Sequence, residues 1–401
     1  METLWISDAL DEAAALLRGG GLVAVPTETV YGLAGNGLDA QAVHAIYEVK
    51  GRPERKPLSL MVPGPEALDR YGVDVPEQAR LLAARFWPGP LTLVVKASPE
   101  IPEIVRAGGE TVGLRCPDHP KTLSLLKKAQ IPFAAPSANP SGEPSPKTAE
   151  EVRRYFDGKI AAIVDGGPCG LGRESTLLDV SHTPFRVLRQ GALAAEEITS
   201  ALREGMTLLG ITGPSGCGKT TALEEVERLG GLVIDCDAVY HRLLQSDRGL
   251  LEELETSFPG VVVNGQLDRK ALGQRVFSDP EALARLNALA HRYVSAEVDR
   301  LLDSWAMAGG RMAAVDAIEL FSSGLGARCT ATLAVLAPEE TRLERIMARD
   351  GLDRSAALLR VRAQKPDSYF VKNCGHVLVN DGDRAAFREQ VRAWIKEKQK
   401  R

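Results

Sequence analysis

The sequence lacks the features that mark several classes of protein. Aromatic residues make up only 5% of its 401 residues, and no apolar run approaches the roughly 18 residues that a membrane span requires. The first residues, METLWISDALDE, are acidic and precede no apolar segment of a signal peptide. We therefore expect a cytoplasmic protein that makes no contact with membranes.

Paired cysteines and an excess of one charge are also absent. The six cysteines, at positions 116, 169, 217, 236, 329 and 374, form no C-x-x-C pair and no zinc-ligand spacing, so we expect reduced thiols. Residues 1–205 carry a net charge of −4 and residues 206–401 are neutral. This balance argues against broad, sequence-independent binding of nucleic acid, but it leaves room for local basic clefts.

The chain is long enough for two or three domains, and a boundary is predicted at residue 205. A helical segment ends at Gly205, and Met206 opens a new apolar strand with no flexible linker between them. The domains are therefore predicted to be 1–205 and 206–401. Met206 suggests that two reading frames were joined, although an ordinary internal methionine would look the same.

Both halves alternate short apolar runs with helical segments, which is typical of α/β folds. In the first half the clearest strands are predicted at Leu22–Pro26, Leu58–Val62, Leu91–Lys96 and Thr111–Arg115. The second half begins with strand, glycine loop, helix and strand. That order predicts a parallel, doubly wound sheet.

The glycine loop of the second half, GPSGCGKT from Gly213 to Thr220, fits the phosphate-loop pattern G-x-x-x-x-G-K-[ST]. Its glycines let backbone N–H groups face phosphate oxygens, while Lys219 reaches the outer phosphates and the Thr220 hydroxyl helps to hold Mg²⁺. Asp237 follows the next strand, where an acid can take a proton from a phosphoryl acceptor. Asp316, after the strand Ala313–Val315, is a second candidate acid for orienting Mg²⁺.

These residues lead to a family resemblance. Residues 206–401 resemble dephospho-CoA kinases in the motifs GITGPSGCGKTT, VIDCDAVYH, LNALAHRYV, RIMARDGL and VLVNDG. The resemblance implies a helical lid and phosphoryl transfer from ATP to the 3′-hydroxyl of dephospho-CoA, with Asp237 as base and Lys219 as the second catalytic residue. It implies that ATP is bound by Gly213, Gly216, Cys217, Gly218, Lys219, Thr220, Thr221, Arg349 and Asn380. One departure is Ser322, which stands where the family commonly has an acid.

The first half is similar to the YrdC-like threonylcarbamoyl-AMP synthase family, which has a twisted α/β sheet. The similarity rests on seven elements in order: PTETVYGL, KGRPERKPL, WPGPLTLV, TVGLRCP, APSANPSGEPSP, DGG…ESTLLDV and LRQGA. It implies that L-threonine, bicarbonate and ATP give threonylcarbamoyl-AMP and pyrophosphate, and that the product passes to the machinery that modifies tRNA adenosine. It implies that ATP is held by Lys50, Arg52, Lys56, Thr111, Ser137, Asn139, Ser145 and Arg189, and threonine by Thr29, Arg115, Ala135 and Ser175.

Both resemblances together predict a bifunctional enzyme that uses Mg²⁺ with ATP and has no tightly bound cofactor. Two alternatives stay open. The first half would be an RNA-binding module if its concave face were locally basic, with only the kinase catalytic, and direct tRNA binding is left undecided. The second half would be a nucleotide-binding switch if it bound ATP without transferring phosphate.

Overall fold

The computed structural model describes residues 2–399, and these fall into two compact units. The first comprises the described residues up to Gly205 together with Met307–Gly309, and the second comprises 206–306 together with 310–399. The change of unit at Gly205 and Met206 coincides with the end of helix α8 (Ala195–Glu204) and the start of strand β12 (Thr207–Thr212).

The first unit is built on one mixed sheet of eleven described strands. Their order is β1-β9-β2-β3-β8-β4-β7-β6-β10-β11, and β5 pairs with β6. The sheet combines parallel pairs such as β4–β7 and β6–β10 with antiparallel pairs such as β2–β3 and β6–β7. The strands are β1 (Leu4–Ile6), β2 (Val23–Val25), β3 (Gly32–Asn36), β4 (Ser59–Met61), β5 (Gly72–Val73), β6 (Leu91–Ala97), β7 (Thr111–Arg115), β8 (Phe133–Ala134), β9 (Ala162–Val164), β10 (Thr176–Asp179) and β11 (Arg186–Arg189).

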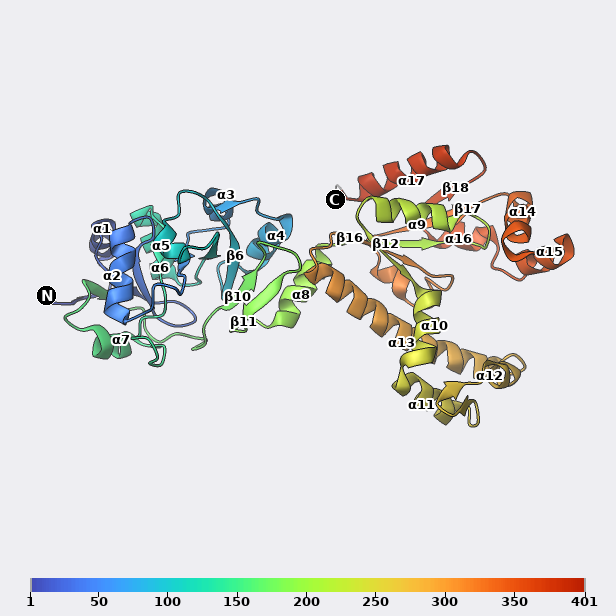
Figure 1. The fold of residues 1–401 in the computed structure, drawn as a ribbon, viewed down its shortest axis with the longest axis horizontal. Helices are drawn as coiled ribbons and strands as arrows, with labels where there is room; N and C mark the ends of the chain where they lie inside the picture. The colour runs from blue at the N-terminus through green and yellow to red at the C-terminus, as the bar shows by residue number, and fades with distance from the viewer. Residues whose placement is uncertain (1, 400–401) are drawn as a thin grey trace. The chain divides into compact units, whose positions relative to one another are not determined.

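Helices pack against this sheet (Figure 1). Leu17 of α1 and Leu126 of α6 join strand residues such as Val25 and Phe133 in one buried cluster. Burial of such side chains is the main force that holds a helix on a sheet. Besides α8, the helices are α1 (Leu10–Arg18), α2 (Ala40–Lys50), α3 (Ala67–Tyr71), α4 (Glu77–Phe86), α5 (Glu103–Arg106), α6 (Pro120–Ala129) and α7 (Ala149–Phe156).

The second unit has a five-stranded sheet in which every neighbouring pair is parallel. The order β13-β16-β12-β17-β18 places β12 at the centre, so the loop that follows β12 lies at the middle of the carboxyl edge. The remaining strands are β13 (Leu232–Asp235), β16 (Met312–Asp316), β17 (Ala331–Leu336) and β18 (His376–Val379), with a separate hairpin of β14 (Val262–Val263) and β15 (Gln266–Leu267).

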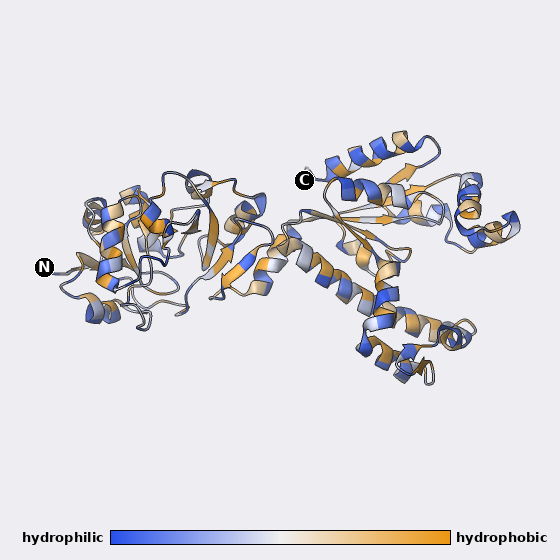
Figure 2. Ribbon diagram, in the orientation of Figure 1, coloured by the Kyte–Doolittle hydropathy of each residue, from blue (hydrophilic) through white to orange (hydrophobic). Residues whose placement is uncertain are grey.

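Helices pack on both faces of the parallel sheet. Val226 of α9 and Trp394 of α17 bury against Leu333 on one face, whereas Phe370 of α16 packs with Ala334 on the other. Figure 2 shows why: α17 carries both hydrophilic and hydrophobic residues, while the strands beneath are mainly hydrophobic. The doubly wound parallel sheet predicted from sequence is therefore confirmed.

A helical arm and a helical pair complete the second unit. In sequence, the arm lies between β13 and β16, and it contains the 28-residue helix α13. The helical pair consists of α14 and α15, which form their own small apolar cluster. The helices of this unit are α9 (Lys219–Arg228), α10 (Cys236–Ser246), α11 (Arg248–Ser257), α12 (Arg269–Val276), α13 (Pro280–Met307), the 3₁₀ turn η1 (Leu325–Arg328), α14 (Glu339–Asp350), α15 (Arg354–Arg362), α16 (Asp367–Asn373) and α17 (Arg384–Gln399).

Candidate functional sites

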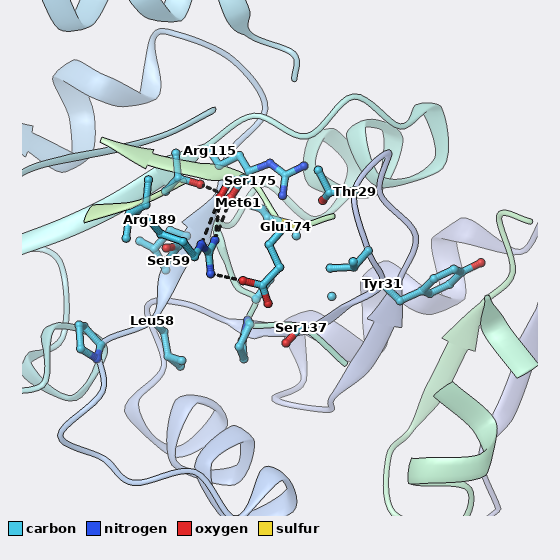
Figure 3. A pocket seen from close by; sticks show the side chains of 18 of the residues that line it. Thr29, Tyr31, Leu58, Ser59, Met61, Arg115, Ser137, Glu174, Ser175 and Arg189 are labelled. Carbon is cyan, nitrogen blue, oxygen red and sulfur yellow. Dashed lines mark hydrogen bonds and ion pairs between the residues drawn. The ribbon is translucent and has the colours of Figure 1, made fainter. Parts of the chain in front are cut away.

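A cavity of about 200 Å³ opens in the first unit among the ends of β4, β7, β10 and β11 (Figure 3). Its wall combines cationic side chains with hydroxyl groups and the backbone of two loops. Seven residues predicted from sequence line it: Thr29, Arg52, Arg115, Ala135, Ser137, Ser175 and Arg189. The cavity therefore brings together residues implied for threonine and residues implied for ATP.

Arg115 is fixed in this wall by two contacts. Its Nε donates to the carbonyl of Gly89 over 3.2 Å, and its Nη2 donates to Glu28 over 2.6 Å. The second oxygen of Glu28 accepts the backbone N–H of Asp118. Because the side chains of Arg115 and Glu28 are only 9% and 14% exposed, water does little to screen the pair.

The turn that carries Thr29 is held by its own hydroxyls. Thr27 Oγ1 accepts the backbone N–H groups of Thr29 and Val30, and it lies 2.8 Å from Thr29 Oγ1. Across the cavity, Ser175 Oγ lies 2.8 Å from Thr92 Oγ1. The hydroxyls of Thr29 and Ser175 are thus held in place before any ligand arrives.

Lys50 takes a different position from that of a phosphate ligand. Its ammonium is buried and donates to the backbone carbonyls of Ser137 and Asn139. Burial, with a smaller contribution from the charge of Arg52, lowers the pKa of Lys50 to about 7. Lys50 therefore anchors the loop that presents Ser137.

The other four residues implied for ATP also lie away from the cavity wall. Asn139 is buried and donates to the carbonyls of Pro140 and Glu143 within its own loop. Lys56 is exposed, Thr111 begins β7, and Ser145 lines a separate pocket. That these four side chains hold ATP stays a prediction.

Two acids in this region escaped the sequence analysis. Glu28 holds Arg115, and Glu174 lines the cavity and pairs with Arg189. Each is the direct neighbour in sequence of a predicted ligand, Thr29 or Ser175. That adjacency was the signal that could have found them.

In the second unit the phosphate loop joins β12 to α9. Gly216 and Gly218 have positive φ angles of 80° and 99°, which glycine adopts readily. A Cβ on Gly218 would lie 2.1 Å from Nδ2 of Asn380, so the loop also needs a residue without a side chain there. Lys219 Nζ donates to the carbonyl of Gly213 over 3.1 Å, and this contact folds the ammonium back over the loop.

A cavity of about 260 Å³ lies over this loop. Its lining combines the loop backbone with charged side chains from β16 and α14. The residues are Pro214, Ser215, Gly216, Cys217, Gly218, Lys219, Thr220, Asp316, Arg345 and Arg349. Gly213, Thr221 and Asn380 support the loop from outside this lining; Asn380 Nδ2, for instance, donates to the carbonyl of Cys217 over 2.9 Å.

Three carboxylates gather at the carboxyl ends of β13 and β16, where Asp235 and Asp316 are in register. Asp235 caps α10 by accepting the backbone N–H groups of Asp237 and Ala238. Burial raises the pKa of Asp237, and the charge of Asp235 raises it further. Asp235 is therefore structural, and Asp237 remains available as a base.

Asp316 is the least exposed of the three. Burial raises its pKa to about 6; Lys219 opposes this shift, whereas Asp235 and Asp237 add to it. Its Oδ1 is buried and has no hydrogen-bond partner among the described residues. An orphaned carboxylate oxygen in the wall of a phosphate cavity suits a divalent cation.

The arginines of α14 divide into two kinds. Arg342 is buried and donates to the carbonyl of Ser215, so it supports the loop. Arg345 donates to the carbonyls of Gly216 and Cys217 and also lines the cavity. Arg349, the residue predicted from sequence, lines the cavity while pairing with Asp350 over 2.8 Å.

Ser322 lies exposed outside this cavity. Its hydroxyl donates to the Glu319 carboxylate, which also pairs with Lys365 over 2.7 Å. A carboxylate therefore stands next to Ser322 in space.

Two family models match this chain. The model described as telomere recombination, for Sua5, YciO and YrdC, covers residues 15–191, and the model described as dephospho-CoA kinase covers 207–386. The threonylcarbamoyl-AMP synthase of Halorhodospira halophila is 39% identical over 180 residues, which are 45% of this chain and 90% of that protein. The chain belongs to the threonylcarbamoyl-AMP synthase family. It joins a segment of this family to a second segment that matches dephospho-CoA kinases.

Longer relatives match the same segment. The threonylcarbamoyl-AMP synthase of Pyrococcus abyssi is 47% identical over 192 residues, which are 48% of this chain and 56% of that protein. The enzyme of Bacillus subtilis is 46% identical over 209 residues, 49% of this chain and 60% of that protein. The chain thus spans little more than half the length of these relatives.

Two solved structures are similar to parts of this chain. Sua5 of P. abyssi, crystallised with L-threonine, is 29% identical and matches with a TM-score of 0.49 over 80% of this chain and 93% of that one. The dephospho-CoA kinase of Campylobacter jejuni is 25% identical, with a TM-score of 0.33 over 49% of this chain and 99% of that one.

The six cysteines are free, as expected from their spacing. Burial raises the pKa of each of their thiols. Within residues 2–399, no helix combines the length and apolar character needed to cross a bilayer.

Proposed function

We propose that residues 1–205 condense L-threonine, bicarbonate and ATP to threonylcarbamoyl-AMP and pyrophosphate. The observation that carries this proposal is one cavity lined by all four residues predicted for threonine and by three of the eight predicted for ATP. They are Thr29, Arg115, Ala135 and Ser175 for threonine, and Arg52, Ser137 and Arg189 for ATP. Membership of the synthase family supports the same reaction.

The chemistry requires orientation and charge more than a nucleophilic side chain. The threonine amino nitrogen bonds to the bicarbonate carbon with loss of water, which gives a carbamate. A carbamate oxygen then attacks the α-phosphorus of ATP, and the bond from that phosphorus to the bridging oxygen breaks to release pyrophosphate. Arg115 binds the threonine carboxylate, while Arg52 and Arg189 offset the charge that grows on the leaving group.

For residues 206–401 we propose transfer of the ATP γ-phosphoryl group to the 3′-hydroxyl of dephospho-CoA. Asp237 takes the hydroxyl proton as the oxygen bonds to phosphorus, and the bond to ADP breaks. Lys219 and the loop N–H groups neutralise the phosphates, and Arg345 and Arg349 close over them. Two observations support this assignment: residues 207–386 match the dephospho-CoA kinase family model, and a cavity lies over the phosphate loop.

The residues present fit Mg²⁺ that arrives with ATP. Thr220 and Asp316 both line the cavity, and Asp316 has a free buried oxygen. Within residues 2–399, no group of three His, Cys, Asp or Glu side chains is placed to hold a metal unaided. This suits an ion that takes its other ligands from phosphate and water. Bound there, Mg²⁺ supplies positive charge to the transferring phosphate.

The same proposal sets the partners of the protein. Its substrates are ATP, L-threonine, bicarbonate and dephospho-CoA, and no cofactor is tightly bound. Threonylcarbamoyl-AMP passes to the cytoplasmic machinery that transfers the threonylcarbamoyl group to tRNA adenosine.

The test of the first activity also separates it from RNA binding. The purified chain should release pyrophosphate from ATP only when both threonine and bicarbonate are present. A filter-binding titration with tRNA should show weak binding. Tight, steeply salt-dependent tRNA binding without threonine-dependent turnover would make the first half an RNA-binding module instead.

A further inference from the structure

The cavity of the first unit contains a charge that opposes its proposed ligands. Of the described residues that line it, Arg52, Arg115 and Arg189 are cations and Glu174 is the one acid. A triphosphate or a pyrophosphate carries several negative charges, so an acid in this wall repels it. The position of Glu174 therefore needs a reason.

The contacts of Arg189 give that reason. Its Nε and Nη2 donate to the carbonyl oxygen of Ser175 over 3.2 and 3.0 Å, which fixes one edge of the guanidinium to the backbone. The other terminal nitrogen, Nη1, pairs with the Glu174 carboxylate, and Figure 3 shows the two side chains facing each other. Glu174 thus occupies the edge of Arg189 that the backbone leaves available.

Glu174 also reaches the proline-rich loop. The hydroxyl of Ser145 donates to Glu174 Oε1 over 3.3 Å, while Oε2 of the same carboxylate binds Arg189. One carboxylate therefore connects Arg189 of β11 with Ser145, two residues implied to hold ATP. The Glu174 side chain is 36% exposed, so its carboxylate has room to turn away from Arg189 into solvent.

We propose that Glu174 is a placeholder in the polyphosphate subsite, which rests on the proposed synthase function and deepens it. Before a ligand binds, the Glu174 carboxylate pairs with Arg189. A triphosphate or pyrophosphate that binds in the cavity then replaces this carboxylate at the guanidinium. When the reaction ends, the carboxylate pairs with Arg189 again and favours release of pyrophosphate, which Arg52 and Arg189 would otherwise hold tightly. Glu174 therefore weakens the binding of polyphosphate and keeps Arg189 oriented.

The test is calorimetric titration of the full chain with inorganic pyrophosphate. All proteins carry Lys219→Ala, so that the phosphate loop of the second unit has lost its ammonium. In this background Glu174→Gln should bind pyrophosphate about three- to tenfold more tightly, because the competing negative charge is gone. The matched control is Glu196→Gln on α8, an exposed position outside the cavity, and it should leave the affinity unchanged.

A double-mutant cycle checks that the effect passes through Arg189. In an Arg189→Ala background, Glu174→Gln should change the pyrophosphate affinity by less than about twofold, because the pair no longer exists. Unchanged or weaker binding by the single Glu174→Gln variant would overturn the placeholder.

Binding of pyrophosphate needs no turnover, so the two proposals fail separately. If the parent chain made no threonylcarbamoyl-AMP while Glu174→Gln bound pyrophosphate more tightly, the placeholder would stand and the synthase function would fall. If turnover occurred without tighter binding, the reverse would hold.

Discussion

Arg115 and Glu28 form a nearly buried ion pair, with Nη2 of the arginine 2.6 Å from Oε1 of the glutamate. The pair orients a planar guanidinium in the cavity wall, and the carbonyl of Gly89 accepts from its Nε. A lysine at position 115 would keep the charge but has no fork that makes both contacts.

Arg115→Lys should therefore raise the KM for threonine by about 30-fold or more, because the carboxylate of the threonine substrate loses its proposed oriented partner. The KM for ATP in the same reaction should change little. The measurement is pyrophosphate release at varied threonine and then at varied ATP. An equal rise in both KM values would mean that Arg115 shapes the whole cavity and not the threonine end.

The loop glycine of the second unit gives a steric prediction. In Gly218→Ala, the new Cβ would lie 2.1 Å from Asn380 Nδ2 at a φ of 99°. We expect CoA formation to fall at least about tenfold, because the loop must shift to relieve the contact. Gly230→Ala is the control for φ alone, since Gly230 has a φ of 79° with open space around its Cβ position. Equal losses in the two variants would contradict the steric explanation.

The raised pKa of Asp316 predicts a stability effect with a definite sign. Between pH values of about 4 and 6 the folded chain holds a proton on Asp316 that the unfolded chain has released. The free energy of unfolding therefore falls as pH rises through this window, and the full cost of the buried charge is present above pH 6.

Asp316→Asn should remove that cost in the absence of Mg²⁺ and ATP. At pH 7.5 the variant should gain about 2 kcal/mol, seen as slower hydrogen exchange in peptides from β12 and β16, and the gain should vanish near pH 4. CoA formation should fall at the same time, because the proposed ligand of Mg²⁺ is lost. Higher activity together with higher stability would exclude a role for Asp316 with the metal.

The two proposed activities should separate by mutation. Lys219→Ala or Asp237→Asn should reduce CoA formation about 100-fold or more and leave threonine-dependent pyrophosphate release intact, because each variant removes a group from one site only. Arg52→Ala combined with Lys56→Ala should do the opposite. If either change silenced both activities in a folded protein, the two sites would not be independent. Retained nucleotide binding with no CoA formation in the parent chain would favour the nucleotide-switch alternative.

Much of this architecture could be predicted because local patterns and global fold agree. The phosphate loop lies between an apolar strand and a helix, as the positions of Gly213 and Thr220 required. The short strands β1 and β3 were not predicted from the sequence. In β3, Gly32–Asn36, two glycines and a polar end look like a turn. The parallel sheet of the second unit was easier to predict, because its three central strands, β12, β16 and β17, are mostly buried and mainly apolar.

Individual site residues were harder to predict, because side-chain direction depends on distant partners. Lys50 belongs to a cationic loop in sequence, yet it points to carbonyls of Ser137 and Asn139, almost 90 residues later. Glu28 and Glu174 gain their roles only from Arg115 and Arg189, which other strands bring to them. Adjacency to Thr29 and Ser175 points to these two acids, but spacing along the chain does not reveal which arginine each of them contacts.

The central claim is that this one chain carries two working ATP-dependent sites. The most direct test incubates the purified full-length chain with Mg²⁺, ATP, dephospho-CoA, L-threonine and bicarbonate, and measures products by mass spectrometry. We predict that CoA with ADP and threonylcarbamoyl-AMP with pyrophosphate both form. Only one of the two product pairs, from a chain in which both units are folded, would contradict the account.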